Sequence, residues 1–164
     1  PERHTLSVLV DNEPGILARV VGLFSARGYN IESLTVSETE HGRRLSRITV
    51  VVTATPRTLV QIKLQLERLV PVHKVHDLTL EGAPLERELA LIKVAGSGEH
   101  RAETLRLADA FRAQIVDATV ESFVFEVTGK PGKIDSFIGL MQPLGLVEVV
   151  RTGLAAISRG QQGM

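Results

Sequence analysis

Apolar side chains change their spacing early in this chain, and that change narrows the folds that the chain can form. Leu6, Val8 and Val10 alternate with polar or small neighbours, as in a β-strand with one buried face. The next apolar residues recur at helical spacing: Ile16, Leu17, Val20, Val21 and Phe24. A strand therefore passes into a helix within residues 11–15.

The run between strand and helix predicts a loop at the mouth of the helix. Asn12 or Glu13 is expected to cap the helix, and Pro14 suits its first turn because the ring fixes φ. Gly15 would let a ligand approach the backbone closely. Free N–H groups and the helix dipole would stabilise a small carboxylate there. The alternative is structural, with Asn12 only capping and Gly15 only relieving crowding.

The first half of the chain continues with strands and helices in a recognisable order. A helix ends at Gly28, a strand covers 31–38, a polar hairpin covers 41–44, and a strand contains Ile48, Val50 and Val52. Thr55 and Pro56 then begin a helix with one apolar stripe, and a strand over 72–80 follows. The order is βαββαβ, in which two helices cover one face of an antiparallel sheet.

The same order starts again after a break at Gly82-Ala83-Pro84. Strands are predicted over 89–95, 115–120, 123–127 and 146–151, with helices over 101–113 and from Pro131 onward. The fold class is therefore α+β, with two consecutive ferredoxin-like βαββαβ units. We place the first domain at 1–81, a linker at 82–87 and the second domain at 88–164.

Composition excludes several classes of function. The 19 basic and 19 acidic side chains give no net charge, so no global field recruits nucleic acid or an anionic membrane. The absence of cysteine excludes disulfides, thiolate catalysis and cysteine zinc sites. No apolar run reaches about 18 residues, so we expect no membrane span and a cytoplasmic protein.

Three residues of the first unit form the candidate binding site: Asn12, Gly15 and Asn30. An amino acid needs an anion site for its carboxylate and oxygen acceptors for its ammonium group. Loop N–H groups can serve the first, and asparagine side chains can serve both. Asn30 has a structural alternative, which is to turn the chain after Gly28. His73 and His76 are interpreted as solvated or ion-paired surface residues, so no metal site is predicted.

No local pattern indicates catalysis, and we assign no catalytic residue. The glycine-containing runs at 96–99 and 129–133 lack the ending or spacing of a phosphate loop, and no nucleophile elbow is present. A small ferredoxin-like enzyme acting on acyl phosphates is one rival, but Asp11 and Glu13 would repel a phosphate from the first loop. An amino-acid-sensing regulator is another rival; one that binds DNA would need a helix-turn-helix or a basic segment.

Three runs of the sequence resemble known proteins: one short loop and two longer segments. Asn12-Glu13-Pro14-Gly15-Ile16-Leu17 resembles the amino-acid-binding loop of ACT domains, so the first unit is identified as an ACT domain. The run from Gly22 to Val36 closely resembles the small regulatory subunit of acetolactate synthase, also called acetohydroxyacid synthase. The closing run from Arg151 to Gly160 is similar to the carboxyl end of the same family.

The resemblance implies a non-catalytic subunit in branched-chain amino-acid biosynthesis. Such a subunit binds the acetolactate synthase catalytic subunit, raises its activity and confers feedback inhibition by valine or another branched-chain amino acid. Thiamine diphosphate, magnesium and FAD would belong to the catalytic partner, and this chain would carry no cofactor.

The resemblance also implies where the effector binds. ACT units of this family pair side by side into homodimers, and the amino acid, with valine as the expected effector, lies at the interface. Matched by motif, Asn12, Gly15 and Ile16 would come from one protomer and Asn30 from the other. The second unit would assist in pairing or in contact with the catalytic subunit.

Overall fold

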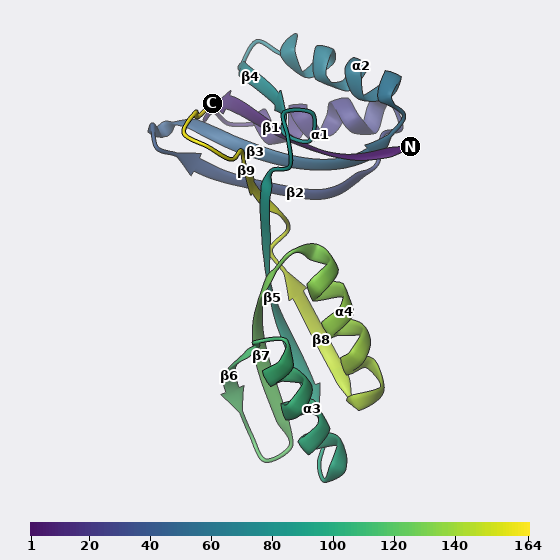
Figure 1. Ribbon diagram of the computed structural model, residues 1–164. Helices are drawn as coiled ribbons and strands as arrows, with labels where there is room; N and C mark the ends of the chain where they lie inside the picture. Colours follow the sequence, from purple (N-terminus) through teal and green to yellow (C-terminus); the bar gives the residue numbers. More distant parts are fainter. The chain divides into compact units, whose positions relative to one another are not determined.

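The computed structural model describes residues 1–164, which form two compact units (Figure 1). The first unit comprises Pro1–Leu85 together with Leu154–Met164. The second comprises Glu86–Gly153. No helix in either unit has the length and apolar character needed to cross a membrane.

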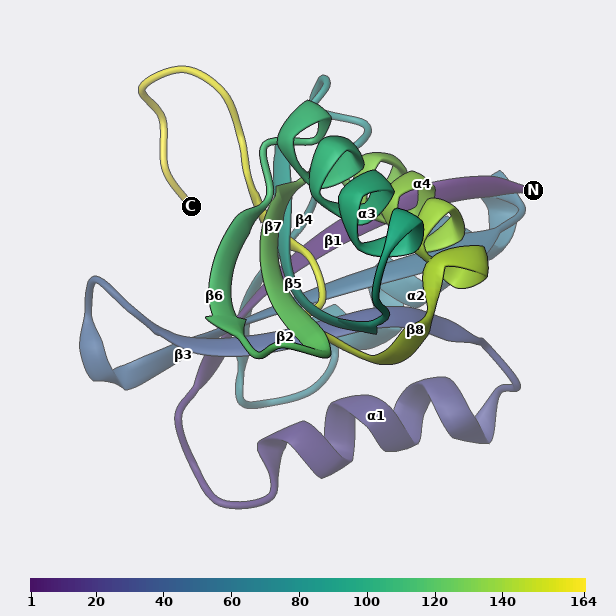
Figure 2. The ribbon, with the colours of Figure 1, turned by 90° about the horizontal axis from the view of Figure 1, so that it is seen from below.

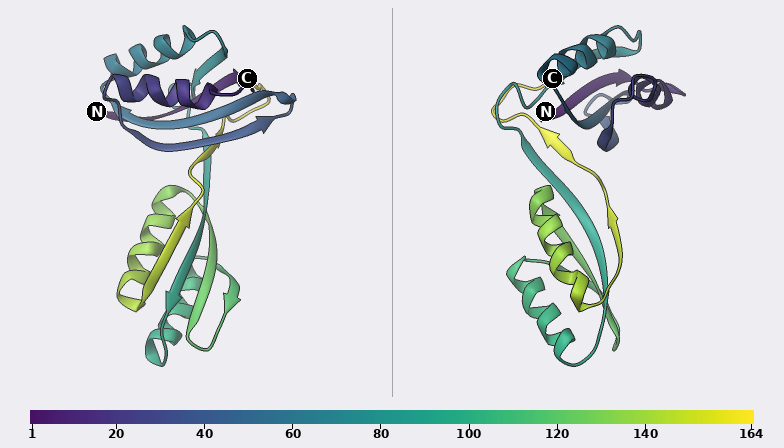
Figure 3. Two further views of the ribbon diagram at one scale, coloured as in Figure 1. Left: turned by 180° about the vertical axis from the view of Figure 1, so that it is seen from behind. Right: turned by 90° about the vertical axis from the view of Figure 1, so that its right-hand side faces the viewer.

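The first unit has the predicted βαββαβ order. Its elements are β1 (Glu2–Asp11), α1 (Ile16–Ala26), β2 (Ile31–Thr39), β3 (Gly42–Ala54), α2 (Pro56–Glu67) and β4 (Val72–Asp77). The antiparallel sheet has the strand order β2-β3-β1-β4, so β2 and β4 are its edges. Both helices cover the same face of this sheet (Figure 3).

Alternation along the central strands fixes which face of the first sheet is apolar. Leu6, Val8 and Val10 of β1 pack with Ile48, Val50 and Val52 of β3 beneath the apolar stripes of the helices. Those stripes supply Ile16, Val20, Leu23 and Phe24 from α1 and Leu59, Ile62 and Leu66 from α2.

The ends of α2 and β4 show how local chemistry sets element boundaries. Thr55 caps α2 as predicted, since its Oγ1 accepts a hydrogen bond from the Thr58 amide at 3.3 Å, and Pro56 occupies the first turn. The strand β4 ends at Asp77, three residues before the predicted end. Asp77 Oδ1 accepts hydrogen bonds from the amides of Thr79 and Leu80, which turns the chain out of the sheet.

The second unit repeats the architecture. Its elements are β5 (Leu85–Ala95), α3 (Glu99–Ala110), β6 (Gln114–Ala118), β7 (Ser122–Gly129), α4 (Pro131–Met141), a short 3-10 helix (Gln142–Leu144) and β8 (Leu146–Arg151). The strand order β6-β7-β5-β8 matches that of the first sheet, and α3 and α4 lie on one face (Figure 2). The two ferredoxin-like units predicted from the sequence are thus confirmed.

Several predicted boundaries in the second unit move. The strand β5 begins at Leu85, inside the predicted linker at 82–87. The helix α3 covers 99–110 instead of 101–113. It stops early because Arg112 takes a positive φ of 57°, although the apolar residues Phe111 and Ala113 continue the helical pattern.

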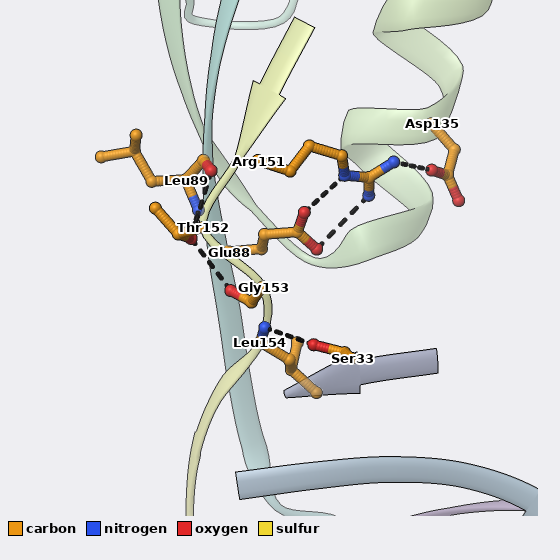
Figure 4. A network of polar contacts seen from close by, with 8 residues as sticks. All are labelled: Ser33, Glu88, Leu89, Asp135, Arg151, Thr152, Gly153 and Leu154. Carbon is orange, nitrogen blue, oxygen red and sulfur yellow. Dashed lines mark hydrogen bonds and ion pairs between the residues drawn. The ribbon is translucent and has the colours of Figure 1, made fainter. Parts of the chain in front are cut away.

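The closing residues belong to the first unit, whereas the sequence placed them in a domain at 88–164. The amide of Leu154 donates to Ser33 Oγ at 2.9 Å (Figure 4), and Thr35 Oγ1 donates to the Leu154 carbonyl at 2.9 Å. Both partners lie on β2, and Leu154 is 1% exposed. A short strand, β9 (Ala155–Ile157), follows. Nothing in the local pattern of residues 154–164 reveals these long-range bonds.

One ion-pair network lies within the second unit. The guanidinium of Arg151 on β8 bonds to the buried Glu88 on β5 and to Asp135 on α4 (Figure 4). Arg151 Nη1 donates to Asp135 Oδ1 at 2.6 Å. The hydrogen bonds to Glu88 and Asp135 raise the pKa of Arg151 against the opposing effect of burial. The network fastens the last strand of the unit to its first strand and to α4.

Candidate functional site

The loop between β1 and α1 opens the helix with a glycine. Gly15 is the N-cap residue of α1, with φ 82° and ψ −3°, and no side chain caps the helix. The predicted cap by Asn12 or Glu13 is therefore wrong, and Pro14 lies in the preceding turn instead of the first helical turn. The left-handed conformation at Gly15 takes the place of a side-chain cap because glycine has no Cβ to oppose it.

Asn12 is tied to the first residues of β3. Its backbone amide donates to the Arg44 carbonyl at 3.0 Å, and its side-chain Nδ2 donates to the Arg43 carbonyl at 2.8 Å. The side-chain Oδ1 accepts no hydrogen bond within the chain. Asn12 thus fixes the loop and still presents one exposed acceptor.

The helix mouth carries the free donors that the sequence predicts. The Ile16 amide donates to the Glu13 carbonyl at 3.3 Å, and the Arg19 amide makes the first helical bond to Gly15 at 3.1 Å. The amides of Leu17 and Ala18 find no acceptor within the chain. These donors and the helix dipole make the loop a suitable place for a carboxylate.

Crowding does not explain the glycine at position 15. A Cβ placed there would meet no atom within 4 Å, so the structural alternative of relieved crowding does not apply. The positive φ is what favours glycine. Ile16, next to it, is 7% exposed and packs in the core, so only its backbone faces the loop.

Asn30 lies beyond the other end of α1, between the turn at Gly28 and the start of β2, and it is exposed. The helix has 11 residues, which at 1.5 Å each separate the two turns by about 16 Å. The whole length of α1 lies between the two turns (Figure 2), so within one chain the structure does not bring Asn30 to the loop that holds Asn12 and Gly15.

The two histidines of β4 form ion pairs with carboxylates, as the paired interpretation predicted. His76 Nδ1 lies 2.9 Å from Glu81 Oε1, and His73 Nε2 lies 2.6 Å from Asp11 Oδ1. Asp11 also donates its amide to the Pro71 carbonyl at 2.8 Å. His73 and Pro71 thus hold the start of the candidate loop, a positioning role that sequence spacing did not reveal.

Sequence reasoning also missed a buried charged cluster at the amino end of β1. His4 is 4% exposed, with Nδ1 at 2.6 Å from Asp77 Oδ2 and Nε2 at 2.9 Å from Glu2 Oε2. Both partners are carboxylates, so a protonated ring can donate to each of them. Burial opposes the charge, but the hydrogen bonds to Asp77 and Glu2 outweigh it and raise the pKa of His4 above its usual value.

This cluster predicts a pH dependence of stability. A histidine whose folded pKa is raised contributes stability that is complete below its unfolded pKa, about 6.5, and is lost as pH rises through the folded value. The free energy of unfolding, measured by urea denaturation, should therefore fall as pH rises above about 6.5. His4→Gln should flatten this part of the profile. His100→Gln, an exposed control, should keep it, and an unchanged profile in His4→Gln would contradict the assignment.

Sequence profiles of known families match both units. Residues 6–74 match the ACT domain of acetohydroxyacid synthase small-subunit-like proteins, and residues 87–160 match the small subunit of acetolactate synthase. The first unit is therefore an ACT domain, as predicted.

Two relatives match this chain in sequence along nearly its whole length. The chain is 47% identical over 160 residues to a probable acetolactate synthase small subunit of Archaeoglobus fulgidus, covering 98% of this chain and 99% of the relative. It is 47% identical over 163 residues to the acetolactate synthase small subunit of Haemophilus influenzae, covering 99% of each chain.

The fold of this chain matches that of a solved structure along the same length. The crystal structure of the acetolactate synthase small subunit from Thermotoga maritima superposes with a TM-score of 0.89 and 38% identity, covering 99% of this chain and 100% of that one. Sequence and fold together show that the chain belongs to the family of acetolactate synthase small, regulatory subunits.

Proposed function

We propose that this chain is the non-catalytic subunit that activates an acetolactate synthase catalytic subunit in the cytoplasm. It would also make that subunit sensitive to inhibition by valine or another branched-chain amino acid. The observation that carries the proposal is the glycine-capped helix mouth of the ACT domain, with its unpaired amides beside an exposed asparagine acceptor. The reaction and its cofactors, thiamine diphosphate, magnesium and FAD, would belong to the catalytic partner.

The effector site is shared between two copies of the chain. A valine molecule cannot span the approximately 16 Å between the two ends of α1. We therefore assign the loop residues Asn12, Gly15 and Ile16 to one protomer and Asn30 to the other. Under two-fold symmetry each pair of chains would carry two such sites.

The topology of the sheet supports this arrangement. Val10 of β1 and Glu38 of β2 both pair with Ser46, so the Asn12 loop lies at the end of the sheet where β2 finishes. The strand β2 is an edge, with unpaired backbone groups available to a second chain. Antiparallel pairing of β2 with its copy would place the start of the partner strand, beside Asn30, at that same end.

Each part of an amino acid then has a recognisable binding group. The carboxylate would accept from the amides of Leu17 and Ala18, and the ammonium group would donate to Asn12 Oδ1 and to the Asn30 side chain of the other copy. Since the effector would contact both chains, it would favour the paired geometry in which the site is complete. A coupling of about 1 to 3 kcal/mol would account for substantial inhibition of the partner.

The direct test is reconstitution with the catalytic subunit from the same source. Acetolactate formation is measured with the catalytic subunit alone, with this chain added, and with this chain plus valine, leucine or isoleucine. We expect the chain to raise the rate and valine to reduce it. A rate that responds neither to the chain nor to any of the three amino acids would refute the proposed function.

A mixed-dimer experiment tests whether the site is shared. Gly15→Asp and Asn30→Ala homodimers should each lack functional effector sites. When the two variants are expressed together, random pairing should restore about a quarter of the sites, because each heterodimer has one intact pair of contributors. Titration calorimetry gives the stoichiometry.

A matched control uses two changes in the same loop. Gly15→Asp mixed with Asn12→Ala should restore no site, because both residues are contributed by the same chain. Equal restoration in the two mixtures would show that Asn30 does not complete the site of its partner.

A further inference from the structure

The sheet of the first unit has a second face, which carries no helix. Strand alternation places Ser7 of β1 and Arg47 of β3 on this face, opposite the core residues Val8 and Ile48. The C-terminal segment, residues 154–164, lies against it (yellow in Figure 1): Ser7 Oγ donates to Met164 Sδ at 3.0 Å, and Arg159 Nε donates to the Ala83 carbonyl at 2.8 Å.

A cavity of about 280 Å³ remains between this face and the C-terminal segment. Its sheet side includes Ser7 and Arg47, and the C-terminal segment contributes Ile157, Ser158, Gln162 and Met164. The volume is at the lower end of the range for small-molecule sites. This cavity is separate from the helix mouth, which contributes no residue to it.

Arg47 is the unusual member of the cavity lining. Its Nε is buried and has no hydrogen-bond partner. Glu40 is the one side-chain carboxylate among the lining residues; it lies 3.7 Å from His41 Nε2, and the charge of Arg47 also acts on it. A buried donor without an acceptor is rare in native proteins, and a ligand in this cavity that accepts from Nε would satisfy it.

We propose that this cavity binds a small aliphatic carboxylate, with Arg47 as the group that recognises it. A guanidinium presents parallel N–H donors that match the two oxygens of a carboxylate. Arg47 is the one cationic side chain of the lining and already has Glu40 near it, so the site fits a monoanion better than a phosphate dianion, whose second charge would have no cation. Leu78, Ile157 and Met164 give the rest of the cavity apolar surface for a short hydrocarbon chain.

The proposed site makes the C-terminal segment part of a ligand response. Two thirds of the lining residues come after residue 154, so a bound carboxylate would hold this segment against the sheet. Amide hydrogen exchange of residues 158–163 should therefore slow when the ligand binds.

The test follows the Arg47 Nε–H signal by ¹H–¹⁵N NMR on the full chain. Acetate, butyrate, hexanoate, inorganic phosphate and the neutral analogue butyramide are titrated in turn. Butyrate or hexanoate should shift the Arg47 signal and the amides of residues 158–163 in a saturable way, and butyramide should not. A response to phosphate equal to that of the carboxylates, or no saturable response to any carboxylate, would overturn the proposal.

Variants separate the site from general anion binding. Arg47→Met should weaken carboxylate binding about tenfold or more, and Arg47→Lys should weaken it less because the charge remains. Arg43→Met is the matched control, since Arg43 is on the same strand with its side chain 92% exposed; it should bind normally.

Carboxylate binding at Arg47 does not depend on the proposed effector site. Gly15→Asp should keep carboxylate binding at Arg47 while losing valine. Should Arg47→Met fail to fold, the titration of the unaltered chain still decides the question. Unchanged binding in a folded Arg47→Met would overturn the proposal.

Discussion

Replacing Gly15 with Asp is expected to weaken valine binding by roughly ten- to a hundredfold, corresponding to the loss of about 1.5 to 3 kcal/mol from a charge-assisted hydrogen bond. The new carboxylate would stand at the helix mouth where the effector carboxylate is proposed to bind. A Cβ at this position meets nothing within 4 Å, so the cost to the fold is limited to backbone strain at φ 82°, on the order of 1 kcal/mol. Activation of the catalytic subunit should persist while inhibition by valine is lost.

Two further variants separate charge from conformation in this experiment. Gly22→Asp adds the same charge on an exposed turn of α1 with open space around it, away from the helix mouth, and should leave valine binding unchanged. Gly15→Ala keeps the loop neutral and tests only the cost of a side chain at φ 82°. Normal valine affinity of Gly15→Asp in titration calorimetry would show that the effector binds elsewhere.

Replacing Gly145 with Ala should destabilise the second unit by about 3 kcal/mol or more. Gly145 has φ 108°, and a Cβ there would stand 2.0 Å from the carbonyl oxygen of Ala95. Its own carbonyl accepts the Ala95 amide at 2.9 Å, so the two backbones cannot separate without breaking a hydrogen bond. Urea unfolding followed by probes in the second unit measures the loss.

The matched control is Gly139→Ala in α4, where a Cβ would meet nothing within 4 Å. This change should be neutral or stabilise the unit by up to about 1 kcal/mol, because alanine favours the helix. If Gly145→Ala unfolds at the same urea concentration as Gly139→Ala, the backbone relaxes around the new methyl group and the packing argument fails.

The Gly145→Ala variant also tests the role proposed for the second unit. If that unit assists in pairing or in contact with the catalytic subunit, activation should fall at temperatures where the unit is unfolded. Valine binding by the ACT domain should then weaken only as far as dimerisation weakens. Sedimentation measures the fraction of dimer separately.

Most of the fold could be predicted because its signals are local. Alternation in Leu6, Val8 and Val10 identifies a strand, and the Thr55-Pro56 pair identifies the start of a helix from residues that are neighbours in the chain. Periodicity was misleading where backbone conformation ended an element before its apolar pattern did. Arg112, with its positive φ, ends α3 despite the apolar residues on either side of it.

The sequence singles out the residue types of the candidate site, and the structure determines their geometry. Asn12, Gly15 and Asn30 were identified from the sequence, yet the expected side-chain cap is replaced by Gly15 in a left-handed conformation. Asn12 instead bonds to carbonyl oxygens of β3, residues distant in the chain. Hydrogen bonds of this kind depend on which strands become neighbours, and no local pattern carries that information.

The sequence alone was enough to establish the two βαββαβ units, the ACT loop and the family, because each depends on short-range periodicity or on contiguous motifs. Only the tertiary structure assigned residues 154–164 to the first unit, buried His4 between Asp77 and Glu2, and placed Arg47 in a cavity without a partner. These features arise when segments far apart in the chain pack together, since burial and the supply of hydrogen-bond partners are properties of the folded surface.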